Sequence, residues 1–84
     1  MTPEKRQQII EENQHMWTTN YDDYMLVRNN RFPEIGYTIH YLPEHFSLIL
    51  EDDDEYVTVI ECMLQANIRV IDIDEYIRIY KQKG

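Results

Sequence analysis

Apolar residues recur at helical spacing in the first part of the chain. Thr2-Pro3-Glu4 is a favourable helix start, because Thr serves as N-cap, Pro fits the first turn and Glu lies near the positive end of the helix. The next apolar residues repeat at i, i+1, i+7 and i+8 and so share one helical face: Ile9, Ile10, Met16 and Trp17. The poor helix formers Thr18-Thr19-Asn20 weaken the pattern. The sequence predicts a helix over 3–18, and a continuation through Tyr21 and Tyr24 stays open.

The pattern then changes to short runs that are typical of strands. Tyr24–Arg28 is either a strand, which we favour, or the last turn of the preceding helix. Asn29–Gly36 contains Asn-Asn, Pro and Gly and predicts a loop. Tyr37–Leu42 is rich in β-branched and aromatic residues and is the clearest strand. Phe46–Leu50 follows the breaker Pro43-Glu44-His45, so the two runs predict a β-hairpin.

Start, period and stop signals agree best between Glu51 and Ile73. Five consecutive acids precede an apolar helical stretch, and any of Asp52, Asp53 or Asp54 can cap a helix over 54–66. Residues at i, i+1, i+4, i+7 and i+8 form its predicted buried face: Tyr56, Val57, Ile60, Met63 and Leu64. Asn67 is suited to the left-handed position after the helix, with Ile68 folding back on the last turn.

The C-terminal part combines a strand-like run with an ambiguous end. Arg69–Ile73 predicts a short strand, and the acids at 72 and 74 can cap a helix over 75–82. An extended strand over the same residues is the alternative, since Ile71, Ile73, Ile77 and Ile79 also alternate. We favour the helix. Together, 84 residues predict one small α+β domain in which two or three antiparallel strands pack against the acid-capped helix.

The charge is distributed unevenly and narrows the choice of partners. The formal net charge is −8, and residues 44–75 contain ten acids with Arg69 as their single base. An acidic body repels phosphate groups, so the charge disfavours direct nucleic-acid binding and favours a protein with a basic surface or groove. An acidic surface that merely keeps a small protein in solution is the simpler explanation.

Candidate catalytic and metal-binding residues are sparse. The run Glu51–Glu55 lacks the alternate spacing and the glycine of a calcium loop. His15, His40 and His45 form no metal-ligand spacing, and the chain has only two glycines, so a nucleotide-binding loop is absent from the sequence. The composition therefore predicts no catalytic residues, no metal and no cofactor.

A second apolar strip lies on the predicted helix 54–66. By the helical period, Cys62 lies roughly 160° from the centre of the predicted buried face, and Val59 and Ala66 join it. Packing against the first or last helix is one interpretation of the strip, and a partner or dimer contact is the other. Nearby acids disfavour a reactive thiolate at Cys62.

The single cysteine also bears on location. One cysteine cannot form an internal disulfide, so a reducing compartment, the cytoplasm, is expected. The sequence contains neither a signal-peptide pattern nor an apolar run approaching the ~18 residues of a membrane span.

These observations favour binding over chemistry. We expect a small acidic, non-enzymatic protein of the inhibitor, immunity or regulatory kind. In element order only, the chain resembles some phage-encoded anti-CRISPR proteins that occupy the nucleic-acid groove of Cas9. A homodimeric structural or accessory domain is the alternative, and a metal-binding protein or enzyme is the least favoured. The predicted partner-binding residues are Glu51, Asp52, Asp53, Asp54, Glu55, Val59, Cys62 and Ala66.

Overall fold

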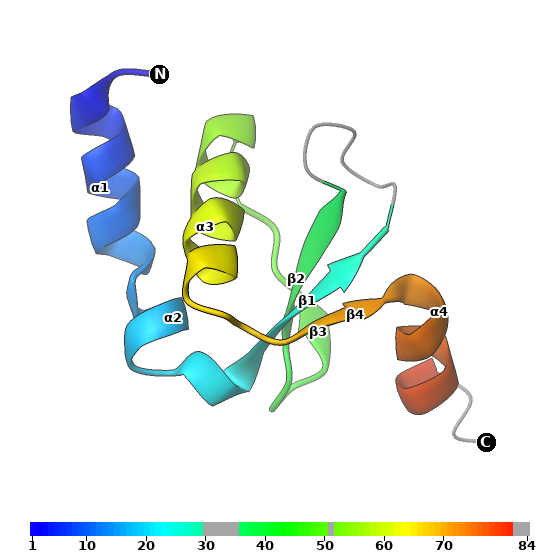
Figure 1. Cartoon of the computed structure of the whole chain (residues 1–84). Coiled ribbons are helices and arrows are strands. Elements are labelled where there is room, and N and C mark those ends of the chain that lie inside the picture. The colour runs from blue at the N-terminus through cyan, green and yellow to red at the C-terminus, as the bar shows by residue number, and fades with distance from the viewer. Residues whose placement is uncertain (30–35, 51, 82–84) are drawn as a thin grey trace.

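Helices cover both faces of a central β-sheet. A computed structural model describes residues 1–29, 36–50 and 52–81. Figure 1 shows α1 (Pro3–Asn13) and α3 (Asp53–Gln65) side by side on one side of the sheet, with the C-terminal helix on the other. The remaining helical elements are α2 (His15–Thr18), the 3₁₀ turn η1 (Tyr21–Asp23), α4 (Ile73–Tyr76) and the π-helical turn η2 (Ile77–Lys81).

Within the described residues, the sheet has four strands and is mixed. Its strands are β1 (Tyr24–Arg28), β2 (Tyr37–Tyr41), β3 (Phe46–Ser47) and β4 (Val70–Asp72), and their order is β3-β2-β1-β4. The β1–β2 and β2–β3 pairs are antiparallel, whereas β4 lies parallel to β1. The α+β class is therefore confirmed, and each predicted strand has a counterpart, although the strand predicted at Phe46–Leu50 is confined to Phe46–Ser47. The parallel strand is an addition to the expected meander, because the crossover through α3 returns the chain to the sheet in the direction of β1.

The predicted N-terminal helix ends where expected but is interrupted. Thr2 caps α1 by accepting a hydrogen bond from the Lys5 backbone N–H, and α2 ends at Thr18. The buried Asn13 side chain donates to the carbonyl of Ile9 at 2.9 Å. Such a local side-chain bond competes with the helical backbone ladder, which explains why the helix breaks at Gln14.

Two turns have the backbone geometry that their sequences indicate. Gly36 has φ of +78° at the base of the loop between β1 and β2, and residues 30–35 of that predicted loop lie outside the described residues. A Cβ there would lie 3.0 Å from the Asn29 carbonyl oxygen, so glycine suits the position. Asn67 has φ of +62° after α3, and Ile68 donates its N–H back to the carbonyl of Met63 at 3.1 Å. This Schellman-type ending was predicted.

The first face of the sheet forms the larger core. Its fully or nearly fully buried members come from both helices and from the sheet: Ile9, Met16, Tyr24, Leu26, Ile39, Tyr56, Val59, Ile60, Met63 and Ile68. The predicted buried face of α3 was partly wrong, since Leu64 is 36% exposed while Val59 is completely buried. The reason is that α3 packs against α1 as well as the sheet, which turns its buried arc towards Val59.

The second face carries a smaller core of its own. Met25 and Val27 are completely buried beneath Tyr76 of α4, and Leu42, Ile71, Ile73 and Tyr80 pack around them. The helical prediction for the C-terminal segment is confirmed, although the helix begins at Ile73 and turns π-helical from Ile77. A single helix-on-sheet core was expected, but the mixed sheet is sandwiched and buries apolar residues on both faces.

Candidate functional site

The acidic run begins α3, and one of its residues has a structural role there. Asp52 is the N-cap, and its Oδ1 accepts a hydrogen bond from the Glu55 backbone N–H at 2.8 Å. This bond, together with the nearby Lys5 ammonium, holds the pKa of the Asp52 carboxyl below its ordinary value. The capping role predicted for this run is therefore confirmed, with Asp52 as the cap.

Two bases of α1 pair with acids of α3. The Lys5 Nζ lies 3.4 Å from Asp52 Oδ2 and 3.5 Å from Asp54 Oδ2, and Asp52 raises the pKa of Lys5. The Arg6 guanidinium lies 3.3 Å from Glu61. These side chains are 40–50% exposed, so the pairs are screened by water and add little to stability. Their larger effect is to neutralise part of the acidic run.

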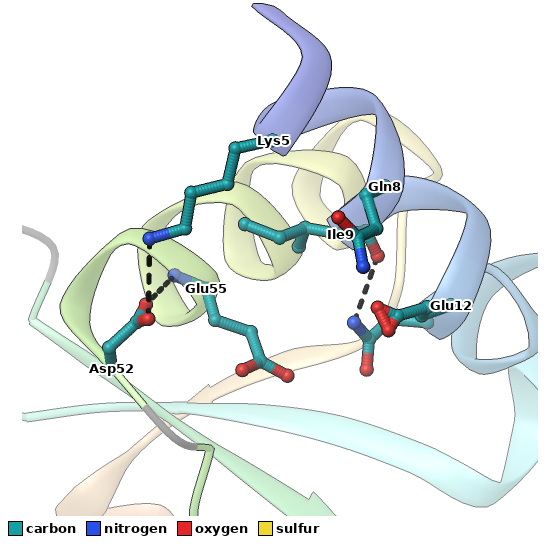
Figure 2. Close-up of a pocket in the computed structure, with 7 residues that line it drawn as sticks. Lys5, Gln8, Ile9, Glu12, Asp52 and Glu55 are labelled. Carbon is teal, nitrogen blue, oxygen red and sulfur yellow. Dashed lines mark hydrogen bonds and ion pairs between the residues drawn. The ribbon is translucent and has the colours of Figure 1, made fainter. Parts of the chain in front are cut away.

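A pocket opens between α1 and the start of α3. It has a volume of about 210 Å³ and is lined by Lys5, Gln8, Ile9, Glu12, Asn13, Asp52 and Glu55. Figure 2 shows Lys5 extending from α1 towards Asp52, while the carboxylates of Glu12 and Glu55 lie further along the same pocket. We call this the α1–α3 acidic pocket. Three carboxylates and a single ammonium line the pocket, so it keeps a net negative charge.

The other predicted residues of the acidic run have different positions. Glu51 lies outside the described residues. Asp53 is exposed on the first turn of α3, and Asp54 is partly exposed and paired with Lys5. The structure thus brings Asp52 and Glu55 together in the pocket and directs Asp53 to solvent.

The strip Val59, Cys62 and Ala66 belongs mainly to the protein interior. Val59 has no exposed surface and shares a core cluster with Ile9 and Met16, against which Ala66 also packs. Cys62 is partly buried, and burial raises the pKa of its thiol, which disfavours the thiolate. Of the two interpretations of this strip, the structure favours packing with α1, because a completely buried Val59 cannot touch a partner.

The three histidines lie against three different tyrosines. His15 lies against Tyr24, His40 against Tyr76 and His45 against Tyr80, with ring centroids 6.3, 4.6 and 6.1 Å apart. Within the described ranges, no group of three His, Cys, Asp or Glu side chains is arranged to hold a metal ion. Each histidine therefore has a packing role with a tyrosine.

Comparisons with known proteins give no relative for this chain. No family model matches the sequence, and no curated protein or solved structure is significantly similar to it. In residues 1–29, 36–50 and 52–81, no helix is both long and apolar enough to cross a membrane.

Sequence reasoning missed the contribution of α1 to the pocket. Lys5, Gln8 and Glu12 line it from a helix that lies far from the acidic run in the sequence. One signal was available: Lys5 and Arg6 are adjacent bases near the start of one predicted helix, and the acids begin the other. Opposite charges on neighbouring helices favour pairing once both helices pack on one sheet face.

The cap makes stability depend on Asp52 at acid pH. Because the folded pKa of Asp52 is lowered, its contribution is complete above the unfolded pKa of about 3.9 and is lost as pH falls through the folded pKa. We expect Asp52→Asn, which still caps, to lose less stability than the wild type between about pH 5 and pH 2. Urea unfolding at several pH values measures this. Asp53→Asn is the control, since it removes the same charge one residue further on, and an equal effect of both variants would contradict the assignment.

Proposed function

We propose that this is a small acidic, non-enzymatic protein of the inhibitor or regulatory kind that binds a basic surface of another protein in the cytoplasm. The observation that supports it best is the α1–α3 acidic pocket, whose lining has three carboxylates, those of Glu12, Asp52 and Glu55, and one base, Lys5. The pocket lies at the surface between two helices that pack against each other, and it suits a lysine or arginine side chain of the partner.

The cap of α3 and the ion pairs of Lys5 do not involve every carboxylate of the pocket. Asp52 caps α3, and Lys5 already pairs with Asp52 and Asp54. Neither the cap nor these pairs uses the carboxylate of Glu12, which is on the exposed side of α1. A carboxylate beyond those used by the cap and the Lys5 pairs adds to the negative potential with which the pocket would attract positive charge.

The base Lys5 allows the proposal to be tested in both directions. Lys5→Gln removes the only positive charge of the pocket and is expected to tighten partner binding about two- to fivefold, because exposed charges interact weakly. Glu12→Gln with Glu55→Gln is expected to weaken it and to reduce its dependence on salt. The cap is preserved, since Asp52 accepts from the backbone N–H of residue 55. Capture from a cell lysate at low and high salt, with identification by mass spectrometry, supplies the partner for these affinity measurements.

A matched control removes the same charge elsewhere. Asp22→Asn with Asp74→Asn changes two exposed acids in η1 and α4, away from the pocket. Partner binding by this variant should equal that of the wild type. Three results would each contradict a binding site at the α1–α3 acidic pocket. These are capture that does not depend on salt concentration, capture of no protein, and an equal loss of partner affinity in the control variant.

The homodimer remains an alternative with fewer possible contacts. Val59 is completely buried, so the apolar strip of α3 offers little surface to a second copy. An edge strand of the sheet, β3 or β4, is the contact left to that alternative. Light scattering that shows a strict monomer would eliminate it.

A further inference from the structure

The strand β3 lies at an edge of the sheet and turns backbone groups away from its neighbour β2. β3 is the last strand in the order β3-β2-β1-β4 and pairs Ser47 with His40 of β2. The N–H of Leu48 donates to Ile39 at 2.8 Å, so the neighbouring Ser47–His40 pair is the non-hydrogen-bonded kind. The N–H and C=O of Ser47 consequently point away from β2. Outward-facing groups on an edge strand form a template for a further strand.

Exposed apolar side chains lie on the same edge. Among the described residues, Ile49 is the most exposed large hydrophobic side chain at 77%, and Phe46 is 45% exposed. Leu48 and Leu50 pack against the core, whereas Ile49 between them is exposed. Neither Phe46 nor Ser47 is charged or proline, so this strand lacks the side chains that commonly block pairing of an edge.

The surroundings of this edge are acidic. Between Arg31 and Arg69 the sequence has no lysine or arginine but eight acids, five of them at 51–55. The Tyr56 hydroxyl donates to the carbonyl of Leu48, which ties the start of α3 to the segment that follows β3. The acids of the first turn of α3 are therefore held close to the chain that carries Ile49.

This charge discriminates between two possible occupants. A second copy that paired β3 with β3 would contribute the same segment, which has no lysine or arginine between Arg31 and Arg69 to pair with the acids. A strand that carries lysine or arginine would place its positive charges beside the acids. Charge complementarity thus favours a basic partner strand over a second copy.

We propose that the β3 edge accepts, as a fifth strand, an extended segment of the partner protein that combines apolar residues with lysine or arginine. The main chain of that segment would hydrogen-bond to Ser47, its apolar side chains would cover Phe46 and Ile49, and its bases would face the start of α3. This is strand addition with charge selection. The inference rests on the proposed function for the basic character of the partner, and it adds the surface and the conformation of the bound segment.

Peptide display tests the proposal without a known partner. Random 12-residue peptides are selected against the full chain, and a selected peptide is synthesised for affinity measurements and amide hydrogen exchange. We expect enrichment of lysine or arginine with β-branched or aromatic residues, and protection of the Ser47 amide on binding.

Ser47→Pro removes the outward N–H at an edge position where proline is tolerated, and should weaken binding at least about tenfold. Ile49→Ser should weaken it several-fold, whereas the matched Leu64→Ser on α3 should change it less than about twofold.

Several results would overturn the proposal. These are recovery of no peptide, enrichment of acidic or helix-forming peptides, equal binding by wild type and Ile49→Ser, and a wild-type dimer that is lost in Ser47→Pro. Circular dichroism checks the fold of each variant. If Ser47→Pro does not fold, the binding affinity of Ile49→Ser and the hydrogen exchange of the Ser47 amide in the wild type test the proposal instead. The two proposals fail separately. If Glu12→Gln with Glu55→Gln weakens a captured partner while the edge variants bind it normally, the acidic pocket stands and strand addition is wrong.

Discussion

Replacing Ile60 by alanine is expected to lower the free energy of unfolding by about 2–5 kcal/mol, because the side chain is completely buried and its loss leaves a cavity. Ile60 lies in the larger core with Leu26, Ile39 and Met63. A domain of this size has little stability to spare, so the loss is a large fraction of a total of about 5–15 kcal/mol. Urea unfolding followed by circular dichroism measures the difference.

Leu64→Ala is the control for Ile60→Ala. Leu64 lies one turn further along α3 and is 36% exposed, so its truncation should cost clearly less than that of Ile60. Alanine is a good helix former at both positions, and any gain in propensity at residue 60 acts against the expected loss. Equal destabilisation by the two variants would contradict the orientation of α3 in the structure. It would instead support the buried face predicted from the sequence, which includes both Ile60 and Leu64.

That comparison also marks the limit of periodicity as a guide to this fold. The start and end of α3 were predictable because Asp52, Asn67 and Ile68 act on backbone groups a few residues away. Which side of α3 is buried depends on α1, which lies distant in sequence and covers Val59. The hydrophobic pattern registers an apolar strip at Val59, Cys62 and Ala66 but contains no information on what covers it.

The sheet shows the same division between local and distant information. Each strand was recognisable from its own residues, yet the parallel pairing of Leu26 with Val70 joins segments separated by the hairpin and α3. A local pattern does not determine such a crossover. The second core follows from it, since β4 leads directly into α4 and carries Tyr76 over the opposite face.

The candidate site was predictable in its acids but not in its shape. Asp52 and Glu55 belong to the acidic run that the sequence singles out, whereas Lys5, Gln8 and Glu12 reach the pocket from α1. The bond from Lys5 Nζ to Asp52 spans 47 positions in the sequence. The structure therefore changes the expectation of one continuous acidic face into a partly neutralised run with a pocket beside it.

The second core gives the other large expected effect. Tyr76→Ala is expected to lower the free energy of unfolding by about 3 kcal/mol or more, since Tyr76 is 7% exposed and is the aromatic residue directly above Met25 and Val27. Its ring also packs against His40 and Tyr80, with centroids 4.6 and 5.1 Å apart. Loss of the ring should therefore release α4 and η2 as well as lower global stability.

Ile77→Ala is the matched control for Tyr76→Ala, because Ile77 is the next residue and is 40% exposed. Hydrogen exchange of the amides in α4 and η2 separates the two expected consequences: faster exchange there beyond the global change shows that the C-terminal helix has detached. If Tyr76→Ala matches Ile77→Ala in both stability and exchange, the second face of the sheet does not depend on α4. Since α1 and α3 are on the opposite face, the acidic pocket should keep its partner affinity in Tyr76→Ala at temperatures where the variant is folded.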